Sequence, residues 1–141
     1  MKKIFFFLLV FIIAVTNQSF FKNTTANAPI NNGNLVYETY CISCHMEDGN
    51  GVEGAFPTLV KTGNLNDQNR LVKIVLQGLR GPIVVKGVNY DAEMAGLTLT
   101  DQEAADVINY IRNTWGNSAP LIKLEDVALA KKAEVKGYQP Y

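Results

Sequence analysis

Histidine and cysteine are scarce in this 141-residue chain, which has one histidine and two cysteines. A structural zinc site takes four ligands, usually from cysteine and histidine, so these side chains cannot complete one. A centre with two histidine ligands to one metal ion is also excluded within a single chain. A plain disulfide between the two cysteines stays open if the chain reaches an oxidising compartment.

Clusters of positive charge are absent as well. The whole chain has 13 basic and 13 acidic side chains, but residues 1–28 hold Lys2, Lys3 and Lys22 and no acid. The remainder therefore has 10 basic and 13 acidic side chains, which is a formal net charge of about −3. A mildly acidic domain of this kind is a poor candidate for binding nucleic acid or anionic membranes through its charge.

The chain also lacks the run of roughly 20 apolar residues that a membrane-spanning helix needs. Its apolar run from Ile4 to Val15 follows Met-Lys-Lys and is broken by polar residues from Thr16 onward. A positive start followed by a short apolar run is typical of an export signal. We therefore expect residues 1–28 to be a signal peptide, cleaved after Ala28 or Ala26 or retained as an uncleaved anchor, and the chain to act in the periplasm.

The length suits one compact domain with a single core. The composition predicts a linker at residues 29–32, the domain itself at residues 33–118, and a C-terminal tail at residues 119–141 that contains one short helix. No internal repeat is visible.

Helical signals recur within the domain. Helices are predicted around residues 35–40, 67–77 and 100–116, with a glycine-rich loop over 47–64 and a short extended piece at 83–85. The middle helix has Asn66 as its expected cap and Gly78 as its stop. The last helix has the clearest start, because Thr100 and Glu103 match the capping box.

The sequence Cys41-Ile42-Ser43-Cys44-His45 has the spacing of a c-type haem attachment site. Cysteines three positions apart lie on one face of a helical turn, which matches the two vinyl groups of haem, and the next residue then lies beneath the iron. A thioredoxin-like redox pair would need a preceding strand, whereas the segment before Cys41 has a helical pattern. We therefore expect one haem c, attached through Cys41 and Cys44, with His45 as an iron ligand.

The second iron ligand follows from elimination among the three methionines. Met1 is lost with the signal peptide, and Met46 is adjacent to His45 and cannot reach the opposite face of the haem. Met94 lies 49 residues after His45, in a predicted loop before the last helix. We expect Met94 to be the ligand. The alternative is that Met94 only packs in the core and leaves an open iron position, as in a haem enzyme or a gas-binding sensor.

With these residues identified, the chain resembles class I c-type cytochromes, in particular the small bacterial domains with one haem. The resemblance covers about residues 33–118 and rests on the attachment motif, Met94, Gly33, Tyr37, Asp48 to Gly51, Phe56, Pro57, Gly78, Leu99 to Asp101, Tyr110 and the Trp115 to Asn117 segment. It implies an all-α fold in which three to five short helices wrap around one haem.

The resemblance also implies particular contacts. Gly33 and Tyr37 would pack on Val107 and Tyr110, where the first and last helices cross. The Pro57 carbonyl would accept a hydrogen bond from Nδ1 of the haem-ligating histidine, which orients the ring and raises its basicity. We interpret the aromatic residues of these helices as core.

The implied function is one-electron transfer. A His and Met ligand pair leaves no open iron position and favours ferrous iron. Such a cytochrome acts alone or as a subunit of a respiratory dehydrogenase or oxidase chain, with redox proteins as partners and with membrane contact only through an uncleaved anchor. The chain departs from the family at one point: proline commonly follows the ligand Met, whereas Ala95 and Gly96 follow Met94 here, which predicts a less rigid ligand loop.

Overall fold

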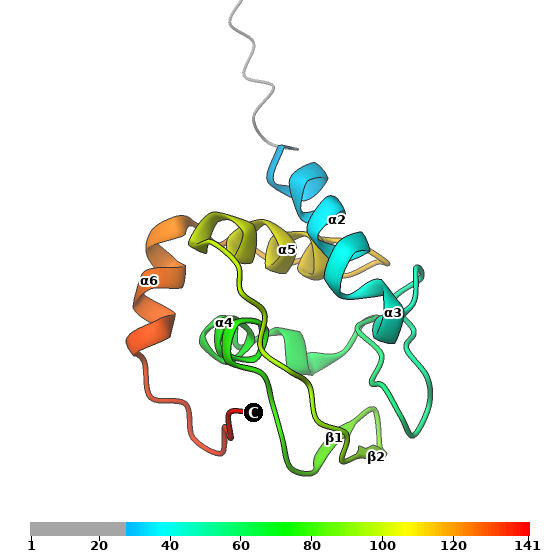
Figure 1. Cartoon of the computed structure of the whole chain (residues 1–141). Helices are drawn as coiled ribbons and strands as arrows, with labels where there is room; N and C mark the ends of the chain where they lie inside the picture. Colours follow the sequence, from blue (N-terminus) through cyan, green and yellow to red (C-terminus); the bar gives the residue numbers. More distant parts are fainter. Residues whose placement is uncertain (1–27) are drawn as a thin grey trace, which may run out of the picture.

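The computed structural model describes residues 28–141, so the expected signal peptide or anchor falls almost wholly outside it. The described elements are α2 (Ala28–Tyr40), α3 (Ile42–His45), the 3-10 helix η2 (Gly63–Leu65), α4 (Gln68–Gln77), β1 (Ile83–Val85), β2 (Val88–Tyr90), α5 (Asp101–Asn113) and α6 (Leu124–Lys132). Figure 1 shows α2 crossing α5 at one end, the β1–β2 hairpin at the other, and α6 beside α4. The expected all-α fold of short helices is confirmed. None of the described helices is long and apolar enough to span a membrane.

Helix α2 starts earlier than the sequence pattern predicts. It begins at Ala28, so residues 29–32, expected to be a linker, belong to its first turns. Pro29 lies in the first turn, where a missing N–H removes no helical hydrogen bond. The sequence pattern misses this start because apolar periodicity reveals only the part of a helix that is buried. Figure 1 shows the start of α2 at the outer end of the molecule, away from α4.

The crossing of α2 over α5 is the centre of the fold. A Cβ atom on Gly33 would clash with the Asp106 carbonyl oxygen and lie 2.7 Å from the Tyr110 Cβ atom, so only glycine allows this approach. Tyr37 is 1% exposed. Its ring centroid lies 5.4 Å from that of Tyr110 and 5.1 Å from that of Trp115. Tilted aromatic pairs at these distances add to the stability gained by burial.

Local side-chain caps set the starts of α4 and α5. The Thr100 hydroxyl accepts from the Glu103 N–H at 3.2 Å, and Glu103 Oε2 accepts from the Thr100 N–H at 2.8 Å, which is the predicted capping box. The cap of α4 is Asp67, whose Oδ1 accepts from the Arg70 N–H at 3.0 Å. The prediction that Asn66 caps this helix is wrong. Asn66 is the residue at which η2 ends, and the cap of α4 is the next residue, Asp67.

The hairpin and the tail complete the domain. Strand β1 pairs with β2 in antiparallel register across a two-residue turn at Lys86 and Gly87. Both turn residues have positive φ, 49° and 80°, as the tight hairpin turn requires. The tail is held at Ile122, whose backbone N–H donates to Asn109 Oδ1 at 2.8 Å and whose carbonyl accepts from Asn109 Nδ2 at 2.9 Å. The helix predicted in the tail is confirmed as α6.

Candidate functional site

The attachment motif forms one helical turn directly after α2. The Cys41 N–H donates to the Tyr37 carbonyl at 2.8 Å and the His45 N–H to the Cys41 carbonyl at 2.9 Å, so the helical pattern of α2 continues into α3. Both cysteines have free thiols, Cys41 buried and Cys44 half-buried. Burial raises the pKa of Cys41 to about 11, so this thiol keeps its proton at neutral pH. Two thiols one turn apart match the two thioether bonds of a c-type haem.

The imidazole of His45 is oriented by a distant carbonyl. Its Nδ1 atom lies 2.9 Å from the Pro57 carbonyl oxygen. Because a carbonyl can only accept, Nδ1 carries the proton and the Nε2 lone pair is free for a metal ion. Burial lowers the pKa of His45, which favours the neutral ring that ligation requires.

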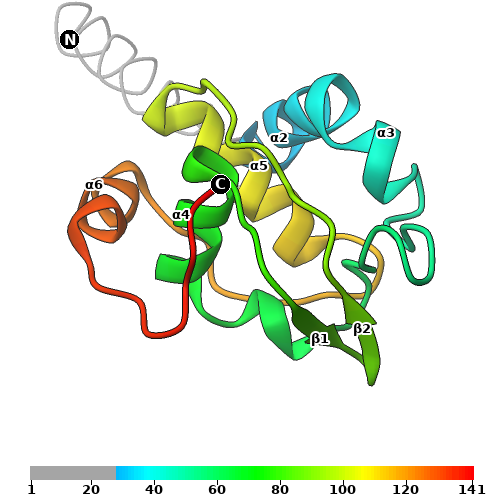
Figure 2. The same cartoon turned by 60° about the horizontal axis from the view of Figure 1, so that its bottom comes forward.

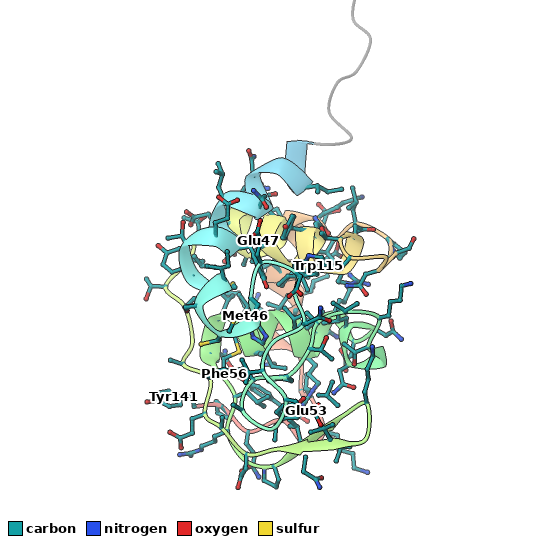
Figure 3. The ribbon with its side chains drawn as sticks, turned by 90° about the vertical axis from the view of Figure 1, so that its right-hand side faces the viewer. Met46, Glu47, Glu53, Phe56, Trp115 and Tyr141 are labelled. Carbon is teal, nitrogen blue, oxygen red and sulfur yellow. The ribbon has the colours of Figure 1, made fainter. Side chains whose placement is uncertain are left out.

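The loop after this turn is fixed by two aromatic side chains. The Tyr37 hydroxyl donates to the Met46 carbonyl at 2.7 Å, and Trp115 Nε1 donates to the Glu47 carbonyl at 3.2 Å. Figure 3 shows Trp115 beside Glu47, with Met46 and Phe56 on the same face. The sequence predicts only core packing for Tyr37 and Trp115. The hydrogen bonds of both side chains go beyond that prediction, and the signal for them is that a phenol or indole packed in the core needs a hydrogen-bond partner.

Two glycines let the same loop return toward the attachment turn. A Cβ atom on Gly49 would lie 2.6 Å from the ring of Trp115, and the φ angles of Gly49 and Gly51 are 70° and 64°. The Gly51 N–H donates to the His45 carbonyl at 3.0 Å. The carbonyl of Pro57 thereby comes within reach of the histidine ring.

Met94 lies on a separate segment, between β2 and α5. Its backbone exchanges two hydrogen bonds of 2.8 Å with Leu79, one in each direction, and the residue is half-buried. A Cβ atom on Gly96 would lie 2.7 Å from the Gln77 carbonyl carbon. The end of α4 and the residues after it therefore position the segment that carries Met94.

These residues fit a covalently attached haem. Two free thiols lie on one turn, an imidazole has its Nδ1 occupied and its Nε2 available, and a thioether sulfur lies on another segment. Among residues 28–141, no three Cys, His, Asp or Glu side chains gather as a metal site of their own. The donor set suits iron that a porphyrin already holds on four sides.

Comparisons with known proteins identify a family that this chain matches. The model of the family described as cytochrome c matches residues 30–115. The chain is 36% identical over 110 residues to cytochrome c-552 of Thermus thermophilus, which covers 72% of this chain and 71% of that protein. It is 41% identical over 96 residues to the cytochrome c subunit of the quinone alcohol dehydrogenase of Gluconobacter oxydans.

That second match covers 64% of this chain and 20% of the alcohol dehydrogenase subunit. The gluconate 2-dehydrogenase cytochrome c subunit of Pantoea cypripedii is 36% identical over 108 residues, 72% of this chain and 24% of that protein. The chain therefore spans only a fifth to a quarter of these dehydrogenase subunits.

Proposed function

This chain belongs to the cytochrome c family, and we propose that Cys41, Cys44 and His45 hold its haem with Met94 as the second iron ligand. Its cofactor is one covalently bound haem c with iron, and its role is to carry electrons, alone or as part of a dehydrogenase. It is an electron-transfer protein, with no substrate chemistry of its own.

The observation that carries the ligand assignment is the His45 to Pro57 hydrogen bond beside two free thiols. It selects the tautomer that can bind iron and raises the basicity of the ring. The bound haem supplies the one-electron redox chemistry. His45 and Met94 would both bind the iron, and the Met94 thioether would raise its reduction potential. This ligand pair would leave the iron no site for a substrate, so the haem would serve one-electron transfer only.

The proposal extends to location and partners. Residues 1–28 have the pattern of an export signal, so the cytochrome acts in the periplasm, either free after cleavage or held by an uncleaved anchor. Several relatives are named as cytochrome subunits of alcohol, gluconate and fructose dehydrogenases. Their names support a redox enzyme of a respiratory dehydrogenase or oxidase chain as the partner.

Acid–acetone extraction of the denatured, haem-loaded protein tests the attachment. Haem should stay on the wild-type chain and on each single variant, Cys41→Ser or Cys44→Ser, because one thioether suffices to retain it. The double variant should release its haem. Release from the wild-type chain would remove the basis of the whole assignment.

Substitution of Met94 tests the second ligand in the same protein. Met94→Ala should lower the reduction potential, abolish the weak long-wavelength band that a methionine–iron bond gives ferric haem, and open ferrous iron to carbon monoxide. Met46→Ala is the matched control and should change none of these. Carbon monoxide binding by the wild type would favour the alternative, an enzyme or gas sensor with an open iron position.

A further inference from the structure

The C-terminal end of the chain lies against the residues that pair with Met94. After α6 the chain turns back, and Figure 2 shows its last residues, in red, passing over α4. The contacts are Tyr138 Oη with the Gly78 carbonyl at 2.8 Å and the Lys73 carbonyl at 3.0 Å, the Arg80 N–H with the Gln139 carbonyl at 3.1 Å, and the Tyr141 N–H with the Gln77 carbonyl at 3.2 Å. The tail therefore hydrogen-bonds to the backbone of residues 77–80.

The same short segment also contacts Met94. Leu79 exchanges both of its backbone hydrogen bonds with Met94. Gly78 is close to both neighbours: a Cβ atom there would clash with the Met94 carbonyl oxygen and lie 2.5 Å from the Tyr141 Cβ atom. A displacement of residues 77–80 would therefore move the segment that carries Met94.

The sequence after Met94 provides little stiffness of its own. Ala95 is exposed, and the next residue is Gly96, where the family resemblance implies a proline after the ligand. Proline fixes its own φ angle, whereas glycine adds conformational freedom that must be lost when the loop is ordered. The order of this loop must therefore come from packing against neighbouring segments.

We propose that residues Tyr138–Tyr141, which we name the C-terminal latch, hold residues 77–80 in place and thereby keep the Met94 sulfur on the iron. The latch acts through Gly78 and Leu79, so its members are positioning residues. The inference rests on the proposed function, because it takes Met94 as the ligand. Without the latch, the methionine leaves the iron more often, and an external ligand competes with it more easily.

The test compares haem-loaded full-length protein with a chain that ends at Lys136. Ferric haem in the shortened chain should bind imidazole about tenfold more tightly, because the bonds that hold the methionine segment are lost. The intensity of the long-wavelength band and the reduction potential should both be lower in the shortened chain than in the full-length protein. Tyr138→Phe, which removes only the hydroxyl, should give a smaller shift in the same direction. Tyr40→Phe is the matched control, since Tyr40 is 50% exposed on α2.

A double-mutant cycle separates positioning from general stability. In a Met94→Ala background, removal of the latch should no longer change imidazole affinity, since no methionine is left to displace. If the shortened chain or Tyr138→Phe is less stable yet keeps wild-type affinity and band, the latch is structural only and the inference fails. If Met94→Ala itself keeps the band, the ligand assignment of the proposed function fails, and the inference fails with it.

Discussion

Tyr37 connects the α2–α5 crossing with the loop that follows the attachment turn. Its ring packs on Tyr110 and Trp115, while its hydroxyl donates to the Met46 carbonyl at 2.7 Å. Burial raises the pKa of Tyr37 above its usual range, because the phenolate would lose its hydration. The folded protein therefore keeps a proton that the unfolded chain gives up near pH 10.

Tyr37→Phe should lower the free energy of unfolding by about 1 kcal/mol at neutral pH, because one buried hydrogen bond is lost. The wild-type stabilisation from Tyr37 is fully present below about pH 10 and declines above it, because only the unfolded chain ionises there. The difference between wild type and Tyr37→Phe should therefore shrink at alkaline pH. Denaturant unfolding of the haem-loaded protein measures it, with Tyr40→Phe as the control. A difference that stays constant with pH would contradict a raised pKa in the folded state.

At the scale of elements, the α2–α5 crossing sets where the attachment turn lies. Gly33→Ala should destabilise the protein by about 3 kcal/mol, because the added methyl would meet the rigid backbone of Asp106. Gly63→Ala is the matched control, because nothing lies within 4 Å of a Cβ atom there. Its cost in free energy of unfolding should be that of a surface substitution, about 0.5 kcal/mol or less. Thermal unfolding measures both. Equal midpoints would show that α2 can shift on α5 without loss.

Elements with strong local signals could be predicted from the sequence. The Thr100 and Glu103 pair placed the start of α5, because both halves of a capping box lie within four residues. The start of α2 could not be predicted, because an exposed first turn has no apolar period and Pro29 is equally typical of a loop. The cap of α4 was missed by one residue, since either Asn66 or Asp67 can cap and only the end of η2 decides between them.

At the scale of the whole molecule, contacts between residues close in the sequence are easier to predict than contacts between distant residues. The attachment residues could be recognised because covalent chemistry requires all three on one turn. The family resemblance implied the approach of Pro57 to His45, whereas the ligand role of Met94 stays a prediction. Nothing in the sequence indicated the latch, because Tyr138 and Gly78 are 60 residues apart and the Tyr138 hydroxyl bonds to a backbone carbonyl, which any residue at position 78 would offer.

The charges near Met94 and the attachment turn belong to the same scale. Asp91 and Glu93 are exposed immediately before Met94, and Glu47 and Asp48 are exposed after the attachment turn. Redox partners dock transiently on small interfaces, where complementary charge sets orientation and on-rate more than affinity. An acidic border of this kind favours a partner with a basic docking patch.

Reversing both charges, with Asp91→Lys and Glu93→Lys, should slow electron transfer to a cationic cobalt complex about tenfold at low salt and leave the reduction potential nearly unchanged. The wild-type rate should fall as salt rises, because exposed charges are screened over about 10 Å at 0.1 M. Glu125→Lys with Glu134→Lys changes the net charge equally on the side of α6, which Figure 1 places across α4 from the hairpin. Stopped-flow rates should change little for this control pair. Equal slowing by both pairs would implicate net charge alone, and a flat salt profile would place the docking surface elsewhere.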